Sequence, residues 1–359
     1  MTKSIFIILI FTVNLVFAQN NNEYLFGEWV KVKSRMVDGS KIISEPFLTS
    51  KFYRWQIFNK KLCTSPDPVN SNYNSCIDFE LENNLIKTSS VSGYEIIKLT
   101  TDTLVVVEKI DDLKDKDKTQ KLWFVKSSII KEQYKNLFKN DSILIANENF
   151  TPKLNKNFIL DINKNFSSMN NFPNFVLIGN LNFIPEQRKL IFEIDNINEK
   201  NNIKNKKAIA FVKSVVENSY NNWDLNDFKN FKKIYMPIIF KSEYYHFDGG
   251  SFKGASFYFF IKDIDDIKKI YGIKMEDLKL SGELYLKGLK SYENKKYDKA
   301  INFFEKSYEV DNRKVDALYN IASIYALLND KLNLCKYLEK LKDLEQTEGI
   351  KLYNENCLN

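Results

Sequence analysis

The sequence contains very little histidine and cysteine, which limits the chemistry that it can carry. Its 359 residues include one histidine, His246, and four cysteines. A single histidine excludes a metal site built from several histidines and leaves one candidate for a Ser-His or Cys-His catalytic pair. His246 lies in the run Tyr244–Asp248, where it is either a general base or ligand, or a ring packed beside aromatic neighbours. No nucleophile motif near it favours catalysis.

The usual signatures of nucleotide-binding and catalytic sites are also missing. The glycines at 249, 250 and 254 lack the spacing and the Lys-Ser/Thr ending of a phosphate loop. The sequence has no Gly-x-Ser-x-Gly elbow, no CxxC or HExxH motif and no calcium loop. Paired acids such as Asp265-Asp266 lie among lysines, as on a solvated helix face, so a hydrolase with an acid pair is the weakest alternative. We predict that the protein is not an enzyme and needs no cofactor and no metal.

Long runs of one charge or of apolar residues are absent from most of the chain. Lys and Arg number 53 against 46 Asp and Glu, a net charge of +7, but they form no long basic block, so no nucleic-acid partner is predicted. After the N-terminus no stretch of about 18 apolar residues occurs, so no stable membrane span is predicted.

The N-terminus is typical of a signal peptide over residues 1–18. Lys3 precedes the apolar segment Ile5–Phe17, and Val16 and Ala18 are small enough for a signal-peptidase site. The alternative is a retained anchor, but the segment is short for a bilayer span of about 20 residues. No cysteine lies near the cleavage site, so lipoprotein attachment has no acceptor. We expect an exported protein that is not a lipoprotein.

Export to an oxidising compartment would let the four cysteines pair. Four cysteines allow three connectivities. Cys63 and Cys76 fall in one β-rich region, and Cys335 and Cys357 fall in a helical region. Local pairing, Cys63 with Cys76 and Cys335 with Cys357, is the simplest prediction, and free buried cysteines are the alternative.

Residues 19–128 are predicted to form an antiparallel β-barrel or sandwich. Six short segments are rich in β-branched and aromatic residues and are separated by turn clusters. They are Glu28–Lys33, Phe52–Phe58, Ser75–Leu81, Tyr94–Leu99, Leu104–Lys109 and Gln120–Lys126. Many short strands without intervening helices favour this class of fold.

The opening of this domain resembles that of lipocalin-like proteins. Gly27 and Trp29 form a Gly-x-Trp motif in the first strand, and the segment Gln120–Val125 is similar to the last strand of such domains. Glycine permits a tight turn, and the tryptophan supplies a large apolar plug. The resemblance implies a barrel of about eight strands that can hold one small apolar ligand. An unrelated sandwich with Trp29 in its core is the alternative.

The central region is predicted to be an α+β domain over residues 146–243, joined to the first domain by a helical connector at 129–145. Two strands, Phe175–Phe183 and Lys189–Ile194, precede a helix at Asn205–Ser219 and a strand at Lys233–Phe240. Because Pro237 cannot donate to a ladder, the last strand is predicted to be an edge strand or to contain a bulge.

This order of elements resembles the C-terminal domain of TonB-family proteins. The resemblance rests on Lys207–Ile209 at the helix start, on Trp223 after the helix and on Ile234–Phe240 as the final strand. The loop Asp224–Phe228 lacks the family's Pro-Gly pair. The resemblance implies an exposed sheet edge that pairs with extended peptides of outer-membrane receptors.

Residues 281–348 repeat with a period of 34 and resemble two tetratricopeptide (TPR) units of helix-turn-helix form. Residues 244–280 are predicted to be a bridge, and the tail at 349–359 belongs to a capping helix at Asp343–Asn356. The small residues Gly288, Ala300 and Ala322 mark close approaches of helices. The family pattern implies a concave protein-binding face that consists of Tyr285, Leu289, Tyr292, Tyr319, Ser323 and Ala326. The alternative is that this face packs on the preceding domain.

Together these patterns predict a multidomain, non-enzymatic protein of the periplasm or outer membrane of a Gram-negative-type cell. Its expected role is docking of an envelope protein or peptide through the TPR groove and the TonB-like edge strand. The alternative function is carriage of a small apolar ligand in the lipocalin-like barrel.

Overall fold

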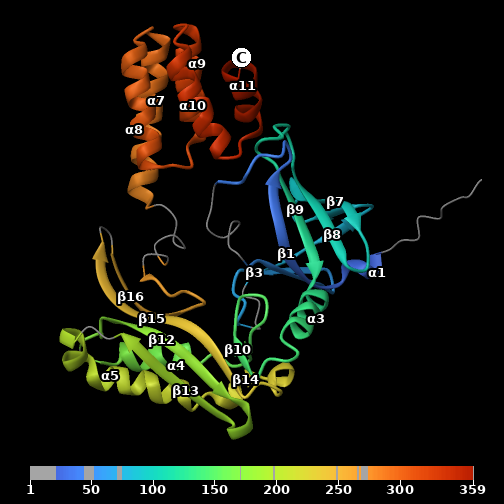
Figure 1. The fold of residues 1–359 in the computed structure, drawn as a ribbon, viewed down its shortest axis with the longest axis vertical. Coiled ribbons are helices and arrows are strands. Elements are labelled where there is room, and N and C mark those ends of the chain that lie inside the picture. Colours follow the sequence, from blue (N-terminus) through green and yellow to red (C-terminus); the bar gives the residue numbers. More distant parts are fainter. Residues whose placement is uncertain are drawn as a thin grey trace, which may run out of the picture.

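The computed structural model of the chain describes residues 22–43, 52–70, 75–169, 171–196, 199–247, 250–264, 267 and 274–358. The predicted signal peptide at 1–18 lies outside these residues. The predicted fold class is confirmed: a barrel-like antiparallel sheet is followed by a mixed α/β region and then by five helices (Figure 1).

The N-terminal sheet is nearly closed. A short helix, α1 (Asn22–Leu25), precedes the strands β1 (Gly27–Met36), β2 (Arg54–Phe58), β3 (Lys61–Ser65), β4 (Ser75–Asp78), β5 (Glu80–Glu82), β6 (Leu85–Lys87), β7 (Ser92–Leu99), β8 (Thr103–Ile110) and β9 (Gln120–Lys126). Their order is β4-β3-β2-β1-β9-β8-β7-β6-β5. The two end strands, β4 and β5, are separated in the chain only by Phe79, so one bent segment joins both ends of the sheet. The strands β3 and β6 were not predicted, because each is short and lacks a long alternating pattern.

Aromatic rings pack together in the interior of the barrel. Trp29, Trp55 and Phe124 are fully buried, and the Trp55 ring lies 4.4 Å from that of Phe124 and 4.8 Å from that of Tyr94 between centroids. Gly27 has a φ of +117°, which confirms that this position requires glycine for a tight turn. Burial of these rings supplies much of the apolar area that stabilises the barrel.

Both predicted disulfides are confirmed. Cys63 and Cys76 are directly opposite each other on β3 and β4. Cys335 and Cys357 join the helices α10 (Lys331–Asp343) and α11 (Thr347–Cys357).

The central domain is a sheet with helices packed on one face. Its elements are α3 (Ser127–Leu137), β10 (Ile143–Ile145), β11 (Lys153–Leu154), α4 (Ile159–Ser167), β12 (Phe175–Ile184), η1 (Pro185–Gln187), β13 (Lys189–Asn196), α5 (Glu199–Glu217), η2 (Tyr220–Asn222), β14 (Trp223–Asp224), η3 (Asn226–Phe228), β15 (Lys233–Phe247) and β16 (Gly250–Phe259). The main order is β10-β15-β12-β13, and β16 also pairs with β15. The boundaries therefore differ from those predicted: β10, placed in the connector, and β16, placed in the bridge, both belong to this sheet.

The prediction that the strand with Pro237 is an edge strand or contains a bulge is wrong: the strand is paired on both sides, and its register with β12 is continuous through Pro237. β15 pairs with β12 on one side, and with β10 and then β16 on the other. Pro237 lies between the end of the β10 pairing at Tyr235 and the start of the β16 pairing at Ile238. The missing N–H of Pro237 is tolerated there because neither β10 nor β16 has a residue paired with this position. The Pro237 carbonyl still accepts a hydrogen bond, from the Phe260 N–H at 2.8 Å.

The C-terminal helices form two helix pairs and a last helix. They are α7 (Met275–Glu293), α8 (Tyr297–Val310), α9 (Val315–Leu327), α10 and α11. The turns within the two pairs place Lys295 and Asn329 in the left-handed region at φ 57° and 56°. These residues are 34 positions apart, so the sequence period is also a period of backbone conformation.

Gly288 lies where α7 and α8 approach closely, as the sequence indicated. A Cβ atom at this position would meet the buried Phe304 ring at 2.6 Å. Replacing Gly288 with Ala is therefore expected to destabilise the helical domain by about 1–3 kcal/mol through overpacking. The matched control is Gly282→Ala in the same helix, where nothing lies within 4 Å and a gain of up to about 1 kcal/mol is expected. Urea unfolding of the full chain, followed by circular dichroism, measures both, and an unchanged stability of Gly288→Ala would contradict the expectation.

The three parts contact one another through polar groups. Between barrel and central domain, the Leu154 N–H donates to the Val69 carbonyl at 2.8 Å, and Val69 is buried in the central core. Between barrel and helices, the Thr347 N–H donates to Ser40 Oγ at 3.0 Å and Arg35 pairs with Glu345 at 2.7 Å. These contacts attach the α10–α11 turn to the loop after β1.

Candidate docking site on the central sheet

Two strands of the central sheet extend beyond their neighbours. The pairing of β15 with β12 ends at Ser242, opposite Phe175, but its pairing with β16 continues to Phe247, opposite Gly250. Residues 243–247 and 250–254 therefore form a two-stranded projection, which we call the aromatic arm and which is visible in yellow and orange at the left of Figure 1. A two-stranded ribbon is only marginally stable by itself, so its position depends on the sheet from which it extends.

The aromatic arm carries partly exposed rings on both faces. Tyr245 and Phe252 are opposite each other with ring centroids 5.3 Å apart, and they are 49% and 41% exposed. On the alternate face the Tyr244 hydroxyl lies 2.8 Å from His246 Nε2. His246, the single histidine, is thus exposed and hydrogen-bonded to a neighbouring tyrosine on its own strand. Cross-strand aromatic pairs stabilise a ribbon, and they also offer apolar contact area to a partner.

The outer edge of β16 is blocked at one position by a side chain. The Asn163 amide of α4 donates to the Ala255 carbonyl at 3.1 Å and accepts from the Ala255 N–H at 2.7 Å. In an antiparallel ladder, the N–H and C=O of one residue point to the same side, and the side alternates along the strand. The backbone groups of Lys253 and Ser251 consequently face the same outer edge as those of Ala255, beyond the part that Asn163 covers.

The opposite edge of the arm is partly occupied. Asn174 donates to the Tyr244 carbonyl at 3.4 Å, and the Ser242 hydroxyl donates to the Pro173 carbonyl at 2.6 Å. Within the described residues, no strand pairs with the outer edge of β16. The segment 250–254 is therefore an open edge that can accept an added strand. β13 is also an end strand of the sheet, and there the Phe192 N–H donates to Glu217 Oε1 of α5 at 3.1 Å.

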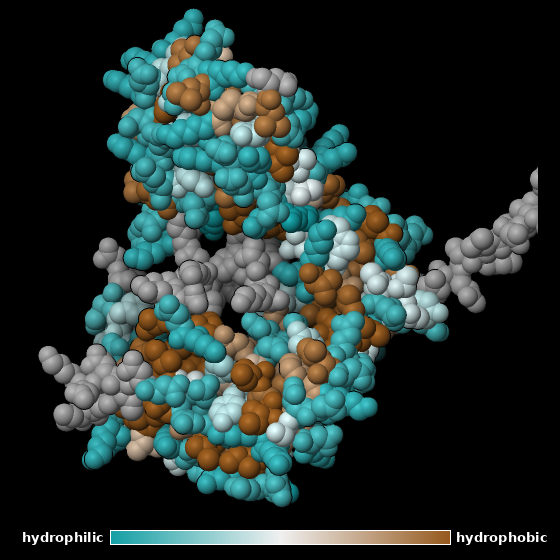
Figure 2. Space-filling model, in the orientation of Figure 1, coloured by the Kyte–Doolittle hydropathy of each residue, from teal (hydrophilic) through white to brown (hydrophobic). Residues whose placement is uncertain are grey.

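The predicted concave-face residues of the helices lie on α7 and α9, and the structure does not bring all of them to the surface. Tyr285 and Leu289 are half-buried against the helical core, and the Tyr319 hydroxyl accepts a hydrogen bond from the Gly349 N–H at 3.1 Å. Tyr292, Ser323 and Ala326 are exposed. Figure 2 shows that this domain, at the top of the view, presents mostly hydrophilic residues on the side that is seen, whereas apolar residues gather lower in the molecule. Binding at the helices stays a prediction.

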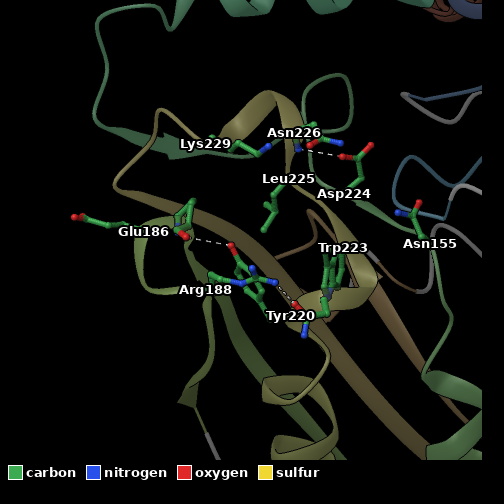
Figure 3. Close-up of a pocket in the computed structure, with 11 residues that line it drawn as sticks. Asn155, Glu186, Arg188, Tyr220, Trp223, Asp224, Leu225, Asn226 and Lys229 are labelled. Atoms are coloured by element: carbon green, nitrogen blue, oxygen red, sulfur yellow. Dashed lines mark hydrogen bonds between the residues drawn. The ribbon is translucent and has the colours of Figure 1, made fainter.

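A polar pocket of about 680 Å³ lies at the other end of the central sheet (Figure 3). Trp223, singled out in the sequence, lines it and is 5% exposed, with its indole N–H donating to Ser219 Oγ at 3.1 Å. Arg188 donates to Asn221 Oδ1 at 2.9 Å, and Tyr220 donates to the Pro185 carbonyl at 3.4 Å. Burial raises the pKa of the Tyr220 hydroxyl, and Arg188 opposes this effect.

The lining of this pocket mixes ionisable, amide and aromatic side chains. Its residues include no serine, threonine, cysteine or histidine, and Glu186 points away from the other side chains in Figure 3. An acid–base pair would need two groups that converge on one substrate atom. The sequence pattern singled out Trp223 but did not predict a pocket, because the lining residues come from separate turns that share no motif.

Comparisons with known proteins give no relative. No protein-family model, curated protein or solved structure matches the chain. Among the described residues, no helix combines the length and the apolar character needed to cross a membrane. No group of three or more His, Cys, Asp or Glu in the described ranges is placed to hold a metal ion.

Proposed function

We propose that the protein is a non-enzymatic docking protein that captures an extended peptide segment by strand addition at the outer edge of β16. The observation that carries this proposal is the open edge at residues 250–254, next to exposed aromatic side chains. The partner's backbone would pair with the outward N–H and C=O groups of Ser251 and Lys253, and its alternate side chains would contact the rings of the arm. The Asn163 amide, which already occupies the outward groups of Ala255, would limit the added strand to the arm.

The proposal differs from the sequence-based expectation in the strand that it uses. The TonB-like resemblance pointed to Ile234–Phe240, but that segment is paired on both sides. β16 pairs with the side of β15 that would otherwise be free, so the open edge is on β16. The TPR-like and lipocalin-like assignments remain part of the proposal, as do export and a place in the periplasm or at the outer membrane. The two disulfides support an oxidising compartment.

A display-selected peptide library tests this function. Peptides enriched on the full chain are expected to lose at least about tenfold in affinity for the Lys253→Pro variant, because proline removes the outward N–H and leaves an acceptor unpaired. Proline is tolerated on an edge strand where the N–H faces solvent, so the fold should survive. The matched control is Lys253→Ala, which removes the side chain but keeps the N–H and should bind normally. Equal binding by the proline variant would contradict strand addition.

The alternative function, carriage of a small apolar ligand in the barrel, has less support. Rings of Trp29, Trp55 and Phe124 occupy the barrel interior. Copurified lipid, or a rise in Tm with an apolar dye, would favour the alternative.

A further inference from the structure

A pocket between the barrel and the helical domain is bordered by cations. Its volume is about 470 Å³, and its walls include Lys33, Arg35, Lys121 and Trp123 from β1 and β9, Thr347 and Ile350 from α11, and one carboxylate, Glu345. We call it the basic pocket. It lies on different elements from the aromatic arm, so an inference about it does not depend on strand addition there.

The strand register sets the four barrel residues side by side. Lys33 is directly opposite Trp123, and Arg35 is directly opposite Lys121. Leu122 and Phe124 point into the barrel core, so Lys121 and Trp123, which alternate with them, point outward. Directly opposite residues in an antiparallel pair share a face, so Lys33 and Arg35 also point outward. The result is a patch in which Lys33, Arg35 and Lys121 share one outward face with the Trp123 ring.

Within the described residues, two of the three cations in the lining form no ion pair. Arg35 pairs with Glu345 at 2.7 Å, and Lys41 pairs with the same carboxylate at 3.2 Å. Among the described residues, neither Lys33 nor Lys121 forms an ion pair. Instead, their Nζ atoms lie 5.0 and 5.1 Å from the centroid of the Trp123 ring. The ring attracts both ammonium groups but does not neutralise them, so the pocket keeps positive charge for an anion.

The helix next to the pocket contributes little hydrogen-bonding capacity of its own. The N–H of Thr347 is bonded to Ser40 and that of Gly349 to Tyr319. An anion would therefore be held by the side chains of Lys33 and Lys121, with the apolar part of the ligand against Ile350 and Trp123.

We propose that the basic pocket binds an acidic segment of an extended peptide, with acids at alternate positions. Lys33 is directly opposite Trp123, so Lys121, two residues before Trp123, is its diagonal neighbour at about 7–8 Å. Acids at i and i+2 of an extended ligand are separated by about 7 Å, which matches this distance. The volume falls within the range of about 300–1,000 Å³ that is usual for ligand pockets. Because the pocket has walls from two domains, such a ligand would also hold the helices against the barrel.

Trp123 provides the readout for a test. The other three tryptophans, Trp29, Trp55 and Trp223, are 0–5% exposed, so a ligand at the surface should change the fluorescence of Trp123. The full chain is titrated with a peptide of alternating Glu and Ala, with the same peptide carrying Gln, and with free succinate. The Glu peptide is expected to change the fluorescence, with an affinity that falls as salt rises from 50 to about 300 mM.

Two double variants with the same change of charge distinguish this site from a general charge effect. Lys33→Gln with Lys121→Gln is expected to weaken binding of the Glu peptide at least about tenfold. Lys60→Gln with Lys98→Gln, at exposed barrel positions outside the pocket, should leave it unchanged. Equal loss in both variants, equal binding of the Gln peptide, or no fluorescence change would overturn the proposal. Succinate binding as tight as the peptide would overturn the peptide assignment. None of these outcomes bears on binding at the arm.

Discussion

The free energy of unfolding is expected to rise by about 2 kcal/mol between pH 7 and pH 10 because of one buried lysine. Lys31 is directly opposite Phe124, so it faces the barrel interior, and it is 8% exposed. Burial lowers the pKa of its amine to about 8 from 10.5. Between these values the unfolded chain binds more protons than the folded one, so stability increases with pH. Below about pH 8 the folded barrel holds the charged amine, which lies 5.3 Å from the centroid of the Tyr53 ring and carries a desolvation cost.

The Lys31→Met variant isolates this contribution. It should be more stable than the wild type at pH 7, and the difference between the two should shrink as the pH approaches 10. Tyr94 sets the upper limit of the pH range, because burial raises the pKa of its phenol and thereby lowers stability once unfolded tyrosines ionise. Lys98→Met, at an exposed position, serves as the control and should show no such difference. Chemical unfolding at several pH values measures the effect, and parallel profiles for wild type and Lys31→Met would contradict it.

Removal of the Arg54 side chain is expected to destabilise the protein by about 2–3 kcal/mol, because the guanidinium is fully buried and hydrogen-bonded, while its partner Glu28 is 28% exposed. Arg54 is 1% exposed, and its guanidinium lies 3.6 Å from Glu28 and donates to the Asn70 carbonyl at 2.9 Å. Glu28 also lies 3.4 Å from Lys153 of the central domain. Arg54→Met would leave the Glu28 carboxylate with Lys153 as its remaining cation among the described residues. It would also remove the hydrogen bond that fixes Asn70 to β2, next to the point where Val69 bonds Leu154 of the central domain.

A double-mutant cycle tests the coupling. Arg54→Met combined with Glu28→Gln should cost clearly less than the sum of the two single changes, because the second change removes the carboxylate that the first leaves behind. Lys61→Met is the control: Lys61 pairs with Asp78 on the barrel surface with both side chains at least half exposed, and its loss should cost about 1 kcal/mol or less. Strict additivity in the cycle would show that Arg54 and Glu28 act independently.

Neither the edge of β16 nor the basic pocket could be predicted from the sequence alone. Residues 244–280 were expected to be a bridge, and the open edge within them depends on the long-range pairing between β15 and β16. The basic pocket was not predicted, because Lys33 and Lys121 are about 90 positions apart and only the barrel register makes them neighbours. The Arg35–Glu345 pair likewise joins segments from opposite ends of the chain.

The amino-acid sequence by itself determined the features that depend on nearby residues. The alternating apolar pattern specifies the strands, the 34-residue repeat specifies the helix pairs, Gly27 and Gly288 mark a tight turn and a close helix contact, and each cysteine pair lies within one local region. Only the tertiary structure decided which strands are edges and which charges are paired. Pro237 illustrates the reason: its missing N–H excludes a hydrogen bond at one point, but the neighbours of that point are set by the whole sheet.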